Sequence, residues 1–141
     1  MVRRVFVTGS AGFIGFHLCR LLVHEGFVVH GYDGMPDYYD VALKQRRHQM
    51  LLQSDAFSRT EGMLEDEALL SKVIDGFRPD VVVHLAAQAG VHYSLENPRA
   101  YLDANIIGAF NVMEAARRLG VQHLLMASTS SGYGANTEMP F

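Results

Sequence analysis

Two patterns of apolar residues follow one another repeatedly along the chain, one typical of strands and the other of helices. Short apolar runs rich in β-branched residues, such as 5–7 and 81–85, suit strands buried in a parallel sheet. Longer segments with apolar residues at helical spacing, such as 13–25, suit helices that cover the sheet. The predicted strands are residues 5–7, 27–32 (followed by Asp33), 56–60, 81–85 and 123–127, and the predicted helices are residues 13–25, 38–53, 65–75 and 101–119.

This alternation predicts an α/β fold in which right-handed βαβ units build one parallel sheet. We expect a Rossmann-type sheet with the strand order 3-2-1-4-5 and with helices on both faces. Gly26, Gly76 and Gly120 follow the last periodic residues of three helices and are predicted to end them. A ligand crevice is expected above the carboxyl ends of strands 1 and 4.

A glycine-rich turn joins the first predicted strand to the first predicted helix. It reads Thr8-Gly9-Ser10-Ala11-Gly12-Phe13-Ile14-Gly15. Gly9 permits a tight turn, Gly12 lets backbone N–H groups reach a diphosphate, and Gly15 lets the helix lie close on the sheet. Because a helix N-terminus also attracts anions, the turn predicts a dinucleotide site. An ordinary glycine turn is the alternative.

Asp33 closes the second predicted strand, where a carboxylate can accept hydrogen bonds from both hydroxyls of an adenosine ribose. Its charge would repel a 2′-phosphate, so the sequence favours NAD over NADP. Arg46 and Arg47 lie downstream and qualify this preference. The simpler interpretation is that these two arginines form a solvated helix face.

Composition and charge exclude several other classes of function. The 141 residues carry a net charge of −3, which argues against a surface for nucleic acid or an anionic membrane. We see neither a signal peptide nor an apolar run near the roughly 18 residues of a membrane span, so we expect a soluble, cytoplasmic protein. Cys19 is expected to be a small buried hydrophobe, and no residue cluster has convincing metal-ligand spacing.

Several stretches of the sequence are similar to the extended short-chain dehydrogenase/reductase family of nucleotide-sugar enzymes. They are the Gly-x-x-Gly-x-x-Gly spacing with Phe13-Ile14-Gly15, the segment His84-Leu85-Ala86-Ala87, the stretch 105–111 (NIIGAFN) and the stretch 127–134 (ASTSSGYG). Further stretches resemble UDP-glucuronate 4-epimerases within that family, namely 37–41 (DYYDV), 88–91 (QAGV), 93–98 (YSLENP) and 139–141 (MPF). The resemblance runs the length of the chain.

This resemblance implies an NAD-dependent isomerase that epimerises a UDP-sugar, UDP-glucuronate to UDP-galacturonate, through a transient 4-keto sugar. It implies that Leu85, Ala86 and Ala87 lie along the cofactor together with the glycine turn. By the same resemblance the cofactor-binding residues are Gly9, Ala11, Gly12, Phe13, Ile14, Gly15, Asp33, Leu85, Ala86 and Ala87. Thr129 aligns with a catalytic Ser or Thr, and the substrate-binding residues are Gln88, His92, Ser94, Ser130 and Ser131.

The serines that follow Thr129 help to distinguish which reaction an enzyme of this family catalyses. Related 4,6-dehydratases place Asp and Glu after the Thr, and related decarboxylases carry a Glu where Ser131 stands. Epimerisation needs no further acid or base there, so Ser130 and Ser131 favour it. The structural alternative is that these hydroxyls cap the strand. The chain departs from the family at His92, where an Arg is usual, and at Gly132, where a Val is usual. His92 is either a weaker donor to the substrate or a loop histidine.

The family's Tyr-x-x-x-Lys motif, which supplies the catalytic base, has no counterpart in the 141 residues. We therefore expect residues 1–141 to be an incomplete Rossmann domain that ends after strand 5 and is inactive alone. Its exposed sheet edge would favour self-association. The alternatives are a non-catalytic NAD-binding module and a portion of a related UDP-sugar dehydratase or decarboxylase. His84 is expected to be a core histidine, and Asn105 to fix the local backbone.

Overall fold

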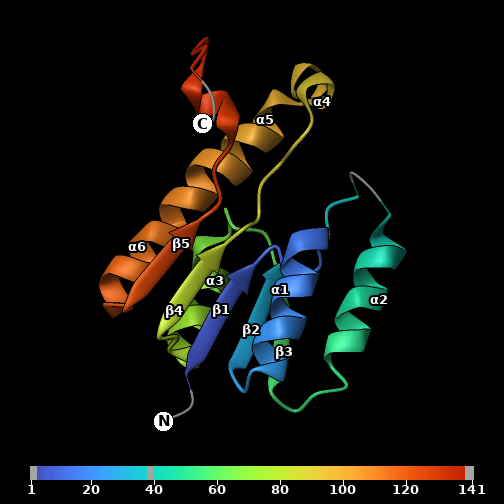
Figure 1. Cartoon of the computed structure of the whole chain (residues 1–141), viewed down its shortest axis with the longest axis vertical. Coiled ribbons are helices and arrows are strands. Elements are labelled where there is room, and N and C mark those ends of the chain that lie inside the picture. Colours follow the sequence, from blue (N-terminus) through green and yellow to red (C-terminus); the bar gives the residue numbers. More distant parts are fainter. Residues whose placement is uncertain (1–2, 38–39, 139–141) are drawn as a thin grey trace.

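A five-stranded parallel sheet forms the centre of the structure, a computed structural model that describes residues 3–37 and 40–138 (Figure 1). The strands are β1 (Arg4–Thr8), β2 (Val28–Asp33), β3 (Phe57–Glu61), β4 (Val81–His84) and β5 (His123–Met126). Their order is β3-β2-β1-β4-β5, and each neighbouring pair is parallel. The predicted fold class and strand order are therefore confirmed.

Helices connect the strands and cover both faces of the sheet. They are α1 (Phe13–His24), α2 (Val41–Leu51), α3 (Glu67–Phe77), α4 (Val91–Glu96), α5 (Pro98–Tyr101) and α6 (Ala109–Leu119), with a π-helical stretch η1 (Leu102–Gly108) before α6 and a 3₁₀ turn η2 (Ser130–Tyr133) after β5. In Figure 1, α4 and α5 rise above the carboxyl ends of the strands. These two helices lie near the edge of the sheet where the crevice was expected.

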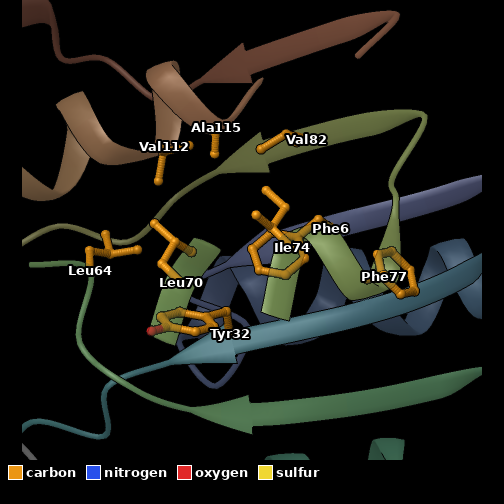
Figure 2. Close-up of a cluster of buried hydrophobic side chains, with 9 residues drawn as sticks. All are labelled: Phe6, Tyr32, Leu64, Leu70, Ile74, Phe77, Val82, Val112 and Ala115. Carbon is orange, nitrogen blue, oxygen red and sulfur yellow. The ribbon is translucent and has the colours of Figure 1, made fainter. Parts of the chain in front are cut away.

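An apolar core lies on each face of the sheet, between the strands and the helices that cover that face. Between α3, α6 and one face of the sheet lie Phe6, Tyr32, Leu64, Leu70, Ile74, Phe77, Val82, Val112 and Ala115 (Figure 2). Between α1, α2 and the other face lie Val5, Val7, Phe16, Cys19, Val29, Leu51 and Phe57. Neighbouring residues of β1 thus face opposite cores, as expected for a strand that is buried on both sides.

The helix boundaries correct two predictions. Gly76 lies inside α3, which continues to Phe77 and is followed by Arg78 in the left-handed conformation. The predicted helix 101–119 is divided into the π-helical η1 and α6. Gly26 and Gly120 do follow their helices with positive φ angles of 86° and 61°, as predicted. The predicted start of the second helix at Tyr38 lies outside the described residues.

Candidate functional site

The glycine turn packs tightly against the end of β4. Gly9 has a φ of 74°, a left-handed conformation, and its N–H donates to the carbonyl of Tyr32 at 2.8 Å. A Cβ on Gly9 would lie 2.9 Å from the backbone N of Ala86, and one on Gly15 would lie 2.0 Å from the carbonyl O of Gly9. The turn can therefore take this shape only because both positions lack a side chain.

The first turn of α1 offers backbone N–H groups to a ligand. Gly12 is the N-cap of α1, and no side chain among the described residues caps the helix there. Phe13 and Ile14 follow, with side chains that are 67% and 68% exposed. An uncapped helix N-terminus has unsatisfied N–H donors and a positive dipole end, which together suit a diphosphate.

Asp33 is the buried acid beside this turn. Its Oδ2 accepts from the N–H of Ala11 at 3.0 Å, and its Oδ1 accepts from the N–H of Met35 at 2.9 Å. The ammonium of Lys44 lies 3.7 Å from Oδ1, and both side chains are 6% exposed. Because each carboxylate oxygen can accept more than one hydrogen bond, Asp33 retains capacity to accept from the two hydroxyls of a ribose.

The basic helix α2 differs from its sequence-based interpretation. Arg46 is exposed, as expected of a solvated face. Arg47, however, donates from Nη1 to the carbonyl of Ala11 at 3.0 Å, and Lys44 is buried against Asp33. The sequence interpretation missed Lys44 entirely. The available signal was the spacing of 44, 47, 48 and 51, which places these residues on one face of a helix.

The segment after β4 is held by a buried hydroxyl. Thr8 Oγ1 accepts from the N–H groups of Leu85 and Ala86, each at 3.1 Å, and lies 2.7 Å from His84 Nδ1. With both acceptor positions used, the Thr8 hydroxyl donates to His84 Nδ1, so His84 carries its proton on Nε2. Burial lowers the pKa of His84, and the expected core histidine is confirmed.

Asn105 holds the next part of the same segment. Its Oδ1 accepts from the N–H of Gln88 at 2.8 Å, and its Nδ2 donates to the carbonyl of Gln88 at 2.9 Å. Asn105 lies in the π-helical η1, a type of helix that is frequent at functional sites. The predicted role of Asn105 in fixing the local backbone is confirmed.

One cavity of about 690 Å³ brings most of the predicted cofactor residues together. Those that line it are Gly9, Gly12, Phe13, Ile14, Gly15, Asp33, Leu85, Ala86, Ala87 and Gln88. Ala11 is fully buried behind the turn instead. The lining also includes residues that the sequence interpretation did not single out: Tyr32, Lys44, Met63, Leu64, Glu65 and Arg99. Of these, Arg99 forms an ion pair with Asp103 at 2.9 Å.

The other predicted residues lie outside this lining. His92 and Ser94 are in α4, where their neighbour Tyr93 lines the cavity. Thr129, Ser130 and Ser131 are exposed after β5. Thr129 Oγ1 accepts from the N–H of Ser131 at 3.2 Å and so caps the 3₁₀ turn η2, which differs from the predicted alternative in which the hydroxyls of Ser130 and Ser131 cap the strand. These five polar residues are not among those that line the cavity, but Tyr93 and Ala127, which lie close to them in the sequence, are.

Two other kinds of site are absent from the described ranges. Among residues 3–37 and 40–138, no three His, Cys, Asp or Glu side chains come together as a metal site. None of the helices in these ranges has the length and apolar character needed to cross a bilayer. The donors and acceptors around the cavity suit an organic ligand that carries a diphosphate and a ribose.

The sequence matches the family described as GDP-mannose 4,6 dehydratase over residues 6–141. The chain belongs to this family. Curated relatives of this GDP-mannose 4,6-dehydratase family member include the "Probable UDP-glucuronate 4-epimerase" of Rhizobium meliloti, 54% identical over 98% of the chain, and "Protein CapI" of Staphylococcus aureus, 48% identical over 98% of the chain. "UDP-glucuronate 4-epimerase 3" of Arabidopsis thaliana is 44% identical over 97% of the chain. The chain spans 40%, 41% and 32% of these relatives.

Solved structures similar to this GDP-mannose 4,6-dehydratase family member hold NAD. The Bordetella bronchiseptica enzyme WbmG in complex with NAD superposes with a TM-score of 0.83 and 27% identity, over 100% of this chain and 42% of that one. UDP-glucose-4-epimerase from Stenotrophomonas maltophila, with bound NAD and formylated UDP-arabinopyranose, superposes with a TM-score of 0.82 and 29% identity, over 99% of this chain and 40% of that one. The predicted nucleotide-sugar epimerase resemblance is confirmed at the level of the family.

Proposed function

We propose that residues 1–141 form the NAD-binding part of a nucleotide-sugar 4-epimerase that interconverts UDP-glucuronate and UDP-galacturonate. The observation that carries this proposal is that the glycine turn and Asp33 line one and the same cavity. A dinucleotide needs N–H donors for its diphosphate and an acceptor for its adenosine ribose, and both are present. The relatives named as UDP-glucuronate 4-epimerases support the choice of substrate.

The residues fit NAD in three respects. Gly9 packs directly on the backbone of Ala86, and Gly12, the N-cap of α1, lines the cavity without a side chain that would obstruct a diphosphate. The N–H groups at the start of α1 would bind that diphosphate, and Asp33 would accept from the ribose hydroxyls. Leu85, Ala86 and Ala87 would lie along the cofactor. When bound, NAD supplies a hydride acceptor for a sugar carbon and returns the hydride afterwards.

The roles at the sugar remain part of the proposal. The hydroxyl of Thr129 would bond the 4-oxygen of the sugar, while Gln88, His92, Ser94, Ser130 and Ser131 would bind the rest of the substrate. Neutral serines beside Thr129 supply no carboxyl acid or base, which suits epimerisation better than dehydration or decarboxylation. The exposed position of these hydroxyls after β5 leaves them accessible to a ligand.

Calorimetric titration with NAD and NADP tests the cofactor assignment. We expect Asp33→Asn to weaken NAD binding by about tenfold and to narrow the preference over NADP, because the acceptor loses its charge. Asp55→Asn is the matched control, since Asp55 is exposed and lies outside the cavity lining. Absence of NAD binding by the folded wild-type protein would refute the cofactor assignment.

A second candidate is a module that binds NAD without catalysis. The cavity lining fits this candidate equally well, because the glycine turn and Asp33 need only the cofactor. Titration of UDP-glucuronate into the NAD-saturated protein separates the two candidates, because an epimerase site binds both ligands and a cofactor module binds only NAD. We propose that residues 1–141 alone do not convert UDP-glucuronate, and turnover by them would contradict this.

A further inference from the structure

The face of α2 that points toward the glycine turn is polar rather than apolar. Lys44, Arg47 and His48 occupy this face at the i, i+3 and i+4 positions, and each contacts the turn or Asp33. Only Leu51, one turn later, joins the apolar core of that layer. The inner face of α2 therefore contributes to the structure mainly through polar contacts with the candidate cofactor site.

The peptide groups of Ala11 are held from two directions. The N–H of Ala11 donates to Asp33 Oδ2 at 3.0 Å, and the carbonyl of Ala11 accepts from Arg47 Nη1 at 3.0 Å. Ala11 itself is fully buried and precedes the N-cap, Gly12. Any rotation of the Ala11–Gly12 peptide would break the bond to Arg47 and turn the first N–H groups of α1 away from the cavity.

His48 fixes the preceding residue of the turn. Its Nε2 shares a hydrogen bond of 2.8 Å with Ser10 Oγ, and both side chains are fully buried. Its Nδ1 is buried and has no hydrogen-bond partner among the described residues. A buried imidazole with one unsatisfied nitrogen is costly, so the contact with Ser10 is the polar interaction that accounts for a histidine here.

We propose that Arg47 and His48 are positioning residues: His48 holds the side chain of Ser10, Arg47 holds the Ala11–Gly12 peptide, and together they keep the diphosphate-binding N–H groups in the geometry that binds ligand. This inference rests on the proposed cofactor site. Neither residue lines the cavity, so both act through the turn rather than by touching the ligand. Preorganisation of this kind lowers the ordering cost of binding.

The proposal predicts a selective loss of affinity. A ligand with a diphosphate, such as ADP, depends on the turn, whereas adenosine depends on Asp33 and the neighbouring lining. Arg47→Met should weaken ADP binding by about tenfold and change adenosine binding by less than about twofold. Arg46→Met is the matched control, because Arg46 is exposed on the same helix, and it should leave both affinities unchanged.

Two conservative variants distinguish positioning from bulk packing. His48→Gln places an amide nitrogen near the position of Nε2 and should keep the ratio of the ADP and adenosine dissociation constants close to that of the wild type. His48→Asn reaches only as far as Nδ1 and should lower ADP affinity by about tenfold, as Arg47→Met does. Arg47→Lys, which retains a cationic donor, should restore part of the ADP affinity.

Nuclear magnetic resonance titration and hydrogen exchange supply the readouts. In the wild-type protein, ADP should slow amide exchange in α2 and adenosine should not, because binding and the α2 contacts are linked. That measurement needs no variant, so it decides the proposal even if a variant fails to fold. Equal weakening of ADP and adenosine, or unchanged exchange in α2 with ADP, would overturn the inference. If the wild type binds neither ligand, the proposed function itself fails.

Discussion

At the scale of single residues, the shape of the candidate site depends on glycines, which let backbone segments pack closely together. Gly15 lies in the first turn of α1 and packs against the carbonyl of Gly9, where a Cβ would come within 2.0 Å. Backbone atoms cannot move aside as the end of a flexible side chain can. A single methyl group at this position would therefore separate α1 from the turn that it helps to shape.

Gly15→Ala should destabilise the protein by about 3 kcal/mol or more, because the added methyl overlaps backbone. Gly76→Ala is a matched control, since Gly76 also lies inside a helix but a methyl group added there would meet no atom within 4 Å other than those of its chain neighbours and its own helix backbone. That control should stabilise α3 by about 0.5–1 kcal/mol. Urea unfolding followed by circular dichroism measures both changes. Equal stability of the two variants would contradict the steric explanation.

Cys19 offers a second prediction at this scale. Its side chain is fully buried in the α1–α2 layer, and burial raises the pKa of the thiol to about 12. Since only the thiolate reacts, we expect no labelling of the native protein by iodoacetamide at about pH 8 and complete labelling in denaturant. Rapid labelling under native conditions, read by mass spectrometry, would show that α1 opens from the sheet.

At the scale of elements, η1 links α6 to the segment after β4. A regular helix would rotate Asn105 relative to Gln88, whereas the π-helical stretch allows both hydrogen bonds to the Gln88 backbone. Gly108 ends this stretch, and a Cβ there would lie 2.6 Å from Cβ of Leu64. η1 therefore contacts residues that line the cavity at two points, Gln88 through Asn105 and Leu64 through Gly108.

Asn105→Asp tests this link. A carboxylate can accept from the N–H of Gln88 but repels its carbonyl, so one contact is lost and a repulsion is added. We expect NAD affinity to fall by about fivefold and exchange of the Gln88 amide to accelerate. Asn136→Asp, in the exposed segment after η2, is the control. Unchanged exchange at Gln88 would mean that Asn105 does not hold this segment.

The sequence predicts the long elements well and the short ones poorly. Strands such as β1 and β4 are apolar runs with no competing pattern, so their existence and order follow from composition and connectivity. The short helices α4 and α5 have too few residues to show periodicity. α3 ends at Phe77 with a left-handed Arg78, beyond Gly76, and the local signal for this end is Pro79, because a proline disfavours helical conformation of the residue before it.

The candidate site also contains some residues that the sequence predicts and others that only the fold reveals. Glycines and the terminal acid of β2 are predictable because their backbone roles require those residue types. Lys44, Arg47 and His48 are ordinary helix residues whose importance comes from what α2 packs against. Their partners lie more than ten residues away in sequence, so only the assembled fold brings them together.

At the scale of the whole molecule, uncharged histidines are distributed through the sheet and both layers. Burial lowers the pKa of His48 to about 4, and burial together with the nearby Arg4 lowers the pKa of His30 to about 4. His30 bonds Ser58 and Thr60 on the neighbouring strand β3. The folded protein thus binds fewer protons than the unfolded chain in mild acid.

This difference predicts acid sensitivity. Because the unfolded chain takes up protons near pH 6.5 and the folded protein only near pH 4, the free energy of unfolding should fall as pH drops through that window. The loss from His48 alone should be on the order of 2 kcal/mol. Urea unfolding at several pH values measures it, with His24→Asn, an exposed site, as the control. His48→Gln should flatten the dependence, and an identical slope would contradict the assignment.

Self-association is the remaining prediction at this scale. Apolar side chains are exposed along η1, α6 and the edge strand β5, including Ile106 (62%), Phe110 (57%) and Leu125 (47%). We propose that these surfaces bring copies of the chain together, because an exposed strand edge and apolar face favour pairing. Leu125→Lys should reduce association in sedimentation velocity, while Leu21→Lys on α1 should not. A monomeric wild type at micromolar concentration would contradict the proposal.

Because β1 lies between β2 and β4, its two neighbours in the sheet emerge from the ribosome at different times. β2 and β3 follow β1 closely, whereas β4 pairs with β1 through residues such as Val81 and Val5, far apart in the chain. During synthesis one edge of β1 therefore has no strand to pair with until β4 has emerged. The turn after β1 gains its support from Ala86 only then, so the cavity lining is completed well after the glycine turn itself has been synthesised.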